Sequence, residues 1–247
     1  MSKICISNVS FIAQDSEFPL EILNDISFDV VDDEFVCLLG PSGCGKSTLL
    51  KMIAGMKQYD TGTILFEDFH YAKPRLGMMF QQATLMGWRT VEENLSLPLE
   101  LLKWEPAVIK DQVISWIKRV DLEGFQDYYP SALSGGMAQR VSLARALIHD
   151  PEYLLFDEPF GALDAMTREQ MSGELLEVWQ NKKKPIIMVT HSISEAVLLA
   201  DKIIVMSKRP GTIVKEIDNP FLRPRTRDLR YTKEFMEISR EVHEHLV

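Results

Sequence analysis

Hydrophobic and polar residues alternate over the first thirty positions of the chain. Ile4, Ile6 and Val9 are separated by more polar positions, and the same alternation returns at Ile26 and Phe28. A period of two is typical of strands that bury one face and expose the other. The pattern therefore predicts half-exposed antiparallel strands at the N-terminus.

Four later segments are short, continuous runs of apolar residues. The first, Phe35–Leu39, is followed by a glycine, and the others cover residues 153–156, 186–189 and 203–206. Strands that are buried on both faces have this composition. Helix-like patterns separate the later runs, so these segments predict an α/β fold with a parallel sheet flanked by helices.

The middle of the chain has a helical period instead. An apolar stripe falls at i, i+4, i+7, i+8 and i+11, and Pro106 stands near its start. The stripe is formed by Ile109, Val113, Trp116, Ile117 and Val120. No buried-strand run occurs between about residues 82 and 149, so this segment is predicted to be an all-helical insertion. The expected division of a single domain, 1–247, is a core of 1–81 and 150–220, a helical part of 82–149 and a tail of 221–247.

The tail combines a basic segment with a short amphipathic pattern. The cations are Arg223, Arg225, Arg227, Arg230 and Lys233, and the apolar positions that follow are Phe235, Ile238, Val242 and Leu246. We interpret the segment as a solvated basic turn before a docked amphipathic helix. A lipid-contacting patch is the alternative.

Composition narrows the function classes. The chain is 46% hydrophobic and 26% charged, as in ordinary soluble globular proteins, and its net charge is −9. An acidic balance argues against broad binding to nucleic acid or anionic lipid. Three cysteines without metal-like spacing argue against a disulfide framework and fit a reducing cytoplasm. No apolar run reaches the roughly 18 residues that span a bilayer, so a membrane role would go through a partner.

Residues 40–48, GPSGCGKST, satisfy the pattern G-x-x-x-x-G-K-[ST] between a predicted strand and a predicted helix. Glycines let backbone N–H groups converge on phosphates, Lys46 can reach the β- and γ-phosphates, and the Ser47 hydroxyl can ligate Mg²⁺. Kinases, GTPases, motor proteins and transport ATPases all use such a segment, which we call the phosphate loop. Its residues are Gly40, Pro41, Ser42, Gly43, Cys44, Gly45, Lys46, Ser47 and Thr48.

Acidic residues and a histidine follow two of the predicted buried strands. Asp157 and Glu158 end one strand, where ligands bind in parallel α/β sheets. Asp157 would complete the Mg²⁺ shell, and Glu158 can position or deprotonate an attacking water. His191 ends another strand and could donate a hydrogen bond to a γ-phosphate. Beside a phosphate loop, this set indicates hydrolysis rather than binding alone.

A second glycine pair stands before another predicted helix. In residues 130–147, PSALSGGMAQRVSLARAL, Ser134 precedes Gly135 and Gly136. A helix N-terminus offers free N–H groups and the positive end of a dipole, so this is also a candidate anion site. The chain therefore carries two candidate phosphate sites that are far apart in sequence.

Taken together, the motifs resemble those of the nucleotide-binding subunit of an ABC transporter. The phosphate loop resembles its Walker A loop, LLFDE its Walker B motif, GALD its D-loop, and LSGGM the signature motif that is particular to this ATPase class. MMFQQ places Gln81 as the Q-loop glutamine, and VTH places His191 as the switch histidine. The resemblance covers nearly the whole chain. It implies a P-loop NTPase core of the ABC ATPase type, with an N-terminal antiparallel β subdomain and an inserted α-helical subdomain.

The resemblance also implies roles for residues on both sides of a dimer. Two subunits would pack head to tail, and each ATP would lie between the phosphate loop of one and Ser134, Gly135 and Gly136 of the other. Gln81 would join Ser47 and Asp157 around Mg²⁺ and sense the γ-phosphate. Asp164 would lie at the dimer seam, and the helical part would receive a cytoplasmic helix of the membrane subunit. The adenine-stacking aromatic would be Phe11 or Phe18.

A narrower resemblance points to the importers of nitrate, sulfonates, taurine and related small solutes. It rests on the phrases PFGALDAMTRE, ISEAVLLAD and SKRPGTI and on the arginine-rich tail. The implied protein is an ATPase that uses ATP and Mg²⁺, is cytoplasmic and lies peripherally on the inner face of the cell membrane. Its implied partners are membrane permease subunits, a second ATPase subunit and, indirectly, a solute-binding protein; a homodimer is expected, with a different ATPase chain as the alternative.

Two other classes remain to be weighed. A soluble ABC-type ATPase of DNA repair would need a coiled-coil insertion or a basic face, which the sequence lacks. One of iron–sulfur cluster assembly is harder to exclude, and the phrase PFGALDAMTRE favours transport over it. A regulator without turnover is disfavoured because Glu158 and His191 are both present. Met137 and Gly87 depart from the family's usual glutamine and proline, and their effect on coupling stays open.

Overall fold

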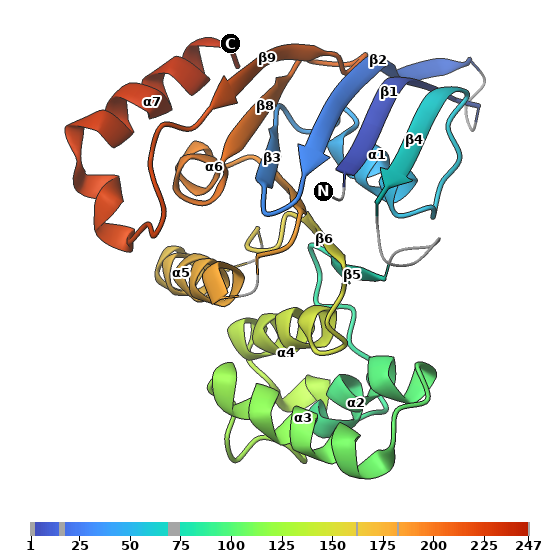
Figure 1. Cartoon of the computed structure of the whole chain (residues 1–247), viewed down its shortest axis with the longest axis vertical. Coiled ribbons are helices and arrows are strands. Elements are labelled where there is room, and N and C mark those ends of the chain that lie inside the picture. Colours follow the sequence, from blue (N-terminus) through green and yellow to red (C-terminus); the bar gives the residue numbers. More distant parts are fainter. Residues whose placement is uncertain (1–2, 15–17, 69–74, 162, 182, 247) are drawn as a thin grey trace.

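The computed structural model describes residues 3–14, 18–68, 75–161, 163–181 and 183–246. Figure 1 shows two sheets in the upper part of the molecule and a separate group of helices below them. The strands are β1 (Lys3–Ala13), β2 (Leu20–Val31), β3 (Phe35–Leu39), β4 (Thr61–Glu67), β5 (Leu76–Met79), β6 (Tyr153–Asp157), β7 (Ile186–Thr190), β8 (Lys202–Met206) and β9 (Ile213–Asp218). The helices are α1 (Lys46–Ile53), α2 (Val91–Leu101), α3 (Pro106–Arg119), α4 (Gly135–Leu147), α5 (Ala165–Asn181), α6 (Ile193–Leu199) and α7 (Lys233–Glu244), with short 3₁₀ turns at Pro130–Ala132 and Arg227–Tyr231.

The alternating N-terminal pattern forms an antiparallel sheet in the order β2-β1-β4. Ile6 pairs with Phe28 on one side and with Ile64 on the other. The apolar members of β1 and β2 face inward, and Ile4 and Ile26 are fully buried. The predicted antiparallel strands are confirmed. The third strand, β4, was not predicted, because its segment is mostly exposed and carries no run of buried positions.

The continuous apolar runs form the centre of a six-stranded sheet in the order β5-β6-β7-β3-β8-β9. The strands from β5 to β8 are parallel, and β9 joins the edge antiparallel to β8. Every residue of β3, β6 and β7 is buried, as expected for a sheet covered on both faces. The α/β class is therefore confirmed, and the carboxyl ends of β3, β6 and β7 share one edge.

Three apolar clusters hold the layers together. Helix α1 lies between the two sheets, where Leu49 and Leu50 pack in the same cluster as Ile4 and Leu38. Helices α5, α6 and α7 cover the other face of the large sheet. A third cluster joins α2, α3 and α4, and the predicted stripe on α3 contributes Val113, Trp116, Ile117 and Val120 to it. Among the described helices, none combines the length and the apolar character that crossing a bilayer requires.

The C-terminal tail differs from the solvated turn that its composition suggested. Arg223 and Arg225 both form ion pairs with Asp201, and Arg225 is only 6% exposed. Arg225 also donates to the carbonyl oxygens of Leu198 and Ala200 at the end of α6. The prediction of a solvated turn is therefore wrong for these two arginines, because a carboxylate and unpaired helix-end carbonyls satisfy their charge and their donors inside the fold. The amphipathic helix docks as predicted, as α7.

Candidate functional site

The phosphate loop connects β3 to α1 and is shaped by glycines. Gly43 and Gly45 have φ values of 78° and 106°, a region that favours glycine. A side chain at Gly45 would also place its Cβ 2.6 Å from Leu23 Cδ2, so β2 closes the loop from outside. No side chain caps the N-terminus of α1. Its first N–H groups therefore stay available to an anion.

Lys46 is held inside this loop and is only 4% exposed. Its Nζ donates to the carbonyl oxygens of Gly40 at 2.7 Å and Pro41 at 2.9 Å. These neutral acceptors position the ammonium group without neutralising its charge. The loop lines a cavity of about 240 Å³. The residues around that cavity are Ile22, Ser42, Gly43, Gly45, Lys46, Ser47, Thr48, Glu158 and Arg209.

A hydroxyl and a carboxylate meet at the floor of the site. Ser47 Oγ donates to Asp157 Oδ1 at 2.6 Å, and Asp157 is only 7% exposed at the end of β6. Burial raises the pKa of Asp157, while the hydrogen bond from Ser47 acts in the opposite direction. The described residues contain no group of three or more His, Cys, Asp or Glu side chains suited to a metal. The two oxygens fit Mg²⁺ only when phosphate and water oxygens supply the remaining ligands, as is usual for this ion.

Glu158, Gln81 and His191 converge from three segments. Glu158 Oε2 lies 3.2 Å from His191 Nδ1 and 3.3 Å from Gln81 Nε2. The backbone of Glu158 has a φ of 46°, unusual for a residue with a side chain, and its N–H donates to Val189 O at 2.9 Å. This backbone turns the side chain of Glu158 away from that of Asp157. The two adjacent carboxylates can therefore serve different purposes, one toward a metal and one toward water.

The corner between β7 and α6 fixes the position of His191. Thr190 Oγ1 donates to Glu195 Oε2 at 2.6 Å and accepts from the N–H of Ser192 at 3.0 Å. Ser192 caps α6 by accepting from the N–H of Glu195. His191 thus stands between two anchored neighbours, while its own ring is half exposed.

Ser134 and the two glycines that follow it border a different cavity, of about 430 Å³. Ser134 caps α4 by accepting from the N–H of Met137, and a Cβ added at Gly135 would meet no atom within 4 Å. Asp164 lines the same cavity and caps α5 by accepting from Thr167; hydrogen bonds from Thr167 lower the pKa of Asp164. This cavity shares no lining residue with that of the phosphate loop. Within one chain, the two candidate phosphate sites are therefore separate.

The structure distinguishes between the two aromatic candidates near the N-terminus. Phe11 packs against the cluster between the sheets, and Lys57 Nζ lies 4.6 Å from the centre of its ring. Phe18 is 75% exposed and stands just before β2, the strand that brings Ile22 to the phosphate-loop cavity. The geometry favours Phe18 as the residue whose ring is accessible for stacking on a base.

Two contacts at the site were missed at the sequence level. Gln139 of α4 donates to Gln81 O at 2.9 Å and so ties the helical group to the Gln81 segment. Arg209 lines the phosphate-loop cavity from the turn between β8 and β9. Its segment, SKRPGTI, contributed to the narrower family resemblance, but no residue pattern in it indicates that the arginine lies at a phosphate loop. The D-loop phrase GALD is described except for Ala162, which lies outside the described residues.

Comparison with known proteins identifies the relatives of this arrangement. The family model described as "ABC transporter" matches residues 23–161. The chain is 43% identical to the aliphatic sulfonates import ATP-binding protein SsuB of a Bacillus cereus strain, over 97% of this chain and 94% of that protein. It is 42% identical to the taurine import ATP-binding protein TauB of Pelagibacter ubique, over 89% of this chain and 85% of that protein.

A solved structure shows the same architecture. It is a dimeric ATP-binding cassette in a post-hydrolysis state, bound to ADP and Pi. Its TM-score with this chain is 0.77 at 28% sequence identity, and the match covers 89% of this chain and 100% of that one.

Proposed function

The chain belongs to the ABC transporter family, and from that premise we propose that it is the ATP-hydrolysing subunit of an importer for small sulfonates. The observation that carries the proposal is the convergence of Glu158, Gln81 and His191 beside the phosphate loop, since a protein that only binds ATP does not need this group. The solute class is supported by two relatives named for aliphatic sulfonates and for taurine, which share the sulfonate group.

Each side chain has a chemical task in this proposal. Lys46 and the N–H groups of the phosphate loop bind the β- and γ-phosphates of the substrate ATP, and Ser47 and Asp157 would hold Mg²⁺. When bound, Mg²⁺ supplies positive charge to the phosphate oxygens. Glu158 accepts a proton from the attacking water, and His191 donates a hydrogen bond toward the γ-phosphate.

The cavity beside Ser134 supports a second ATPase subunit as partner. Its open glycine and its helix N-terminus are suited to phosphate oxygens, yet it lies apart from the phosphate loop of its own chain. A head-to-tail pair would bring each Ser134 to the nucleotide held by the other subunit. We propose a homodimer, which agrees with the dimeric state of the solved relative.

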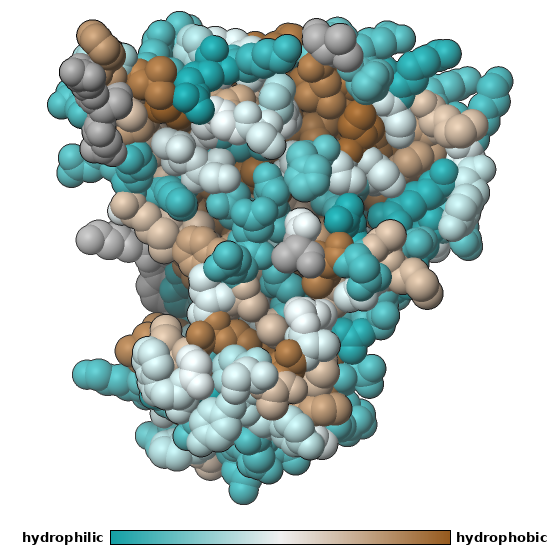
Figure 2. Space-filling view, turned by 180° about the vertical axis from the view of Figure 1, so that it is seen from behind, coloured by the Kyte–Doolittle hydropathy of each residue, from teal (hydrophilic) through white to brown (hydrophobic). Residues whose placement is uncertain are grey.

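A groove between the helical group and the sheet edge fits a helix of a membrane permease. Its volume is about 590 Å³, and its lining combines apolar residues with two arginines. Its lining includes Met78, Phe80, Met86, Leu101, Arg75 and Arg145. Figure 2 shows one face of the molecule, on which hydrophobic side chains gather where the helical group meets the rest. Through such a partner the chain would work at the cytoplasmic face of the membrane, with a solute-binding protein acting indirectly.

The first experiment measures ATP turnover and solution mass for the wild-type chain and for Glu158→Gln. An amide is a poor base, so Glu158→Gln should lose at least about a hundredfold in turnover and still bind ATP. Light scattering should then show an ATP-dependent dimer of the variant. Glu123→Gln, an exposed carboxylate in the helical group, is the matched control and should behave as wild type. Wild-type turnover in Glu158→Gln would contradict the assigned base.

A further inference from the structure

The turn between β8 and β9 is pressed against both β2 and the phosphate loop. The N–H of Gly211 donates to Ile22 O at 2.9 Å, and Gly211 O accepts from the N–H of Asn24 at 3.0 Å. A Cβ at Gly211 would clash with Cys44 O, so only glycine permits this approach. The turn is therefore a wall of the nucleotide cavity rather than a loop beside it.

Hydrogen bonds within the turn hold its shape. Ser207 Oγ accepts from the N–H of Thr212 at 2.9 Å, and the N–H of Ser207 donates to Thr212 O at 3.0 Å. Ser207 Oγ also lies 2.8 Å from Lys208 O and 3.0 Å from Pro210 O. A turn anchored at both ends presents Arg209 from a fixed position.

The guanidinium of Arg209 is oriented by one acceptor. Its Nε and Nη2 donate to Gly43 O at 3.1 and 3.0 Å. Glu158 lines the same cavity but pairs with His191, and no described carboxylate forms an ion pair with Arg209. The carbonyl of Gly43 is neutral, so the cation keeps its full charge and has further donors. A pre-oriented cation with no ion-pair partner among the described residues, at the wall of a site that binds a polyphosphate, is placed to bind an anion.

The residues around the cavity indicate which phosphate this cation would meet. Lys46 and Ser47 mark the end where the β- and γ-phosphates bind, next to Asp157. Ile22, on β2, marks the other side, and the exposed Phe18, the candidate for stacking on the base, precedes β2 in the chain. Arg209 contacts Gly43 and belongs to the turn bonded to Ile22, so it stands on the Ile22 side of the phosphate loop, away from Asp157.

We propose that Arg209 binds the α-phosphate of the nucleotide and acts as a second cation beside Lys46. The inference rests on the proposed function in one respect, namely that this cavity binds ATP. A contact at the α-phosphate is common to ATP, ADP and AMP, whereas a contact at the γ-phosphate would distinguish ATP from the other two.

The test measures nucleotide affinity of the full chain by titration calorimetry with ATP and ADP, and with AMP as a competitor. Arg209→Gln keeps a donor for Gly43 but removes the charge, and Arg209→Lys keeps the charge but loses the planar fork. We expect Arg209→Gln to weaken all three nucleotides by a similar factor of about five or more, with a shallower salt dependence, and Arg209→Lys to recover part of the loss. Lys208→Ala, which removes the neighbouring exposed cation, should leave the affinities unchanged.

Four results would overturn the inference. Unchanged affinity in Arg209→Gln would show that the arginine only supports the loop through Gly43. A loss confined to ATP would move the contact to the γ-phosphate, and a loss for ATP and ADP but not AMP would move it to the β-phosphate. A wild-type chain that does not bind ATP would overturn the proposed function and this inference together, whereas the other three results leave the proposed function intact.

Discussion

Ser47 Oγ and Asp157 Oδ1 lie 2.6 Å apart although 110 positions separate them in the sequence. Ser47 is in the first turn of α1, after β3, and Asp157 ends β6, with β7 between the two strands in the sheet. The phosphate loop therefore reaches across one strand to bring the hydroxyl to the carboxylate. A cation that binds here can use a lone pair of Ser47 Oγ while the hydroxyl still donates to Asp157.

Substitution of Asp157 should change the dependence of turnover on Mg²⁺. Asp157→Asn is expected to raise the Mg²⁺ concentration for half-maximal turnover by about tenfold or more, because the amide holds no negative charge. Removal of divalent cations with a chelator should abolish turnover in the wild type. The measurement is ATPase activity over a Mg²⁺ titration.

The same variant separates chemistry from folding. Burial raises the pKa of Asp157, so its ionised form is disfavoured inside the metal-free chain. Asp157→Asn should therefore keep or raise the melting temperature, and Asp127→Asn, at an exposed position, serves as the control for both readouts. An unchanged Mg²⁺ dependence would show that Asp157 does not serve the metal.

Truncation of the two N-terminal aromatics should affect different properties, ATP affinity for Phe18 and stability for Phe11. Phe18→Ala removes an exposed ring and should weaken ATP binding by about tenfold, since stacking on a base contributes about 1–3 kcal/mol, while stability stays near that of the wild type. Phe11→Ala removes a ring packed between the sheets and should lower the free energy of unfolding by about 1–3 kcal/mol. The affinities of each variant for ATP and GTP report on base stacking, and thermal melts report on stability. Weak ATP binding in Phe11→Ala with normal binding in Phe18→Ala would reverse the assignment.

Gly135→Asp should separate folding from assembly. The structure has open space for the side chain, and a carboxylate in the first turn of α4 is favourable for the helix dipole, so the melting temperature should not fall. Turnover should fall by at least about a hundredfold, because the carboxylate repels the phosphates of the nucleotide on the partner subunit. Gly87→Asp adds the same charge at another open glycine and should keep turnover. Equal turnover of the two variants would show that the Ser134 cavity takes no part in ATP hydrolysis.

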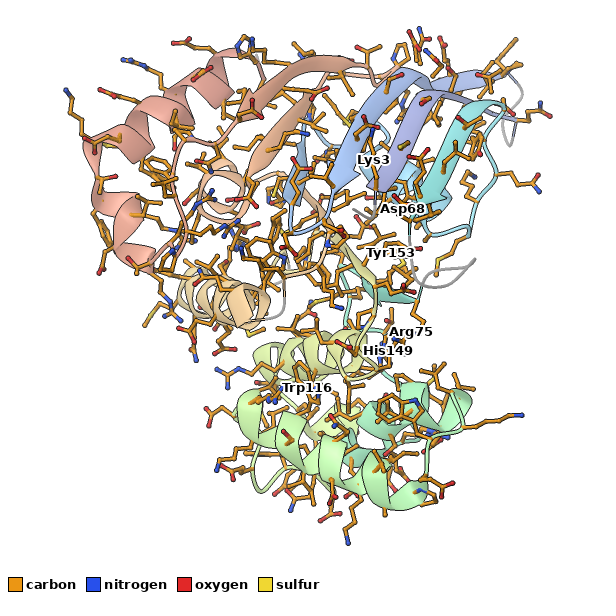
Figure 3. All side chains as sticks on the ribbon, in the orientation of Figure 1. Lys3, Asp68, Arg75, Trp116, His149 and Tyr153 are labelled. Atoms are coloured by element: carbon orange, nitrogen blue, oxygen red, sulfur yellow. The ribbon has the colours of Figure 1, made fainter. Side chains whose placement is uncertain are left out.

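Acid should destabilise the chain through His149, which Figure 3 labels beside Arg75 near the waist of the molecule. Burial is the main cause that lowers the pKa of His149 below its ordinary value of 6.5, and its Nε2 lies 3.0 Å from Leu76 O. Because the folded state resists protonation, the unfolded chain binds more protons, and stability falls as the pH drops below about 6.5. His149→Gln should flatten this part of the stability–pH curve. Denaturant melts between pH 5 and 8 measure the slope; an identical slope in the variant would assign it to other groups.

The central strands and the phosphate loop could be predicted because their signals are local. A strand buried on both faces must be apolar throughout, and β3, β6 and β7 are. The phosphate loop combines glycines, a lysine and a hydroxyl within nine residues, so the residues that bind phosphate can be recognised from one short segment. Glu158 and His191 were predicted from their positions at the ends of buried strands and Gln81 through the family pattern, and the structure brings the three together.

Other features depend on contacts between distant segments, and the sequence carries no local sign of them. β5 has four residues, and Gly77 interrupts its apolar run, so the sequence does not identify it as a strand. Its pairing with β6 in the structure does. Arg225 stands in a basic segment whose composition is typical of a solvated tail. Its ion pair with Asp201 and its hydrogen bonds to the end of α6 make its burial favourable. Arg209 belongs to the site because it donates to the backbone carbonyl of Gly43. Every residue has a backbone carbonyl, so the sequence does not indicate which one will accept this hydrogen bond.

The strand order of the large sheet also bears on how the protein is made on the ribosome. β3, which carries the phosphate loop, pairs with β7 and β8, and both neighbours exist only after the chain has been synthesised from Leu39 to Met206. At bacterial or eukaryotic elongation rates this takes on the order of ten to thirty seconds. During that time the nascent β3 has at least one unpaired edge and an apolar surface, a condition that favours aggregation and recruits chaperones. The capacity to bind nucleotide is therefore acquired only after β8 has been synthesised, and a truncated product that stops before β8 leaves one edge of this fully apolar strand without its partner.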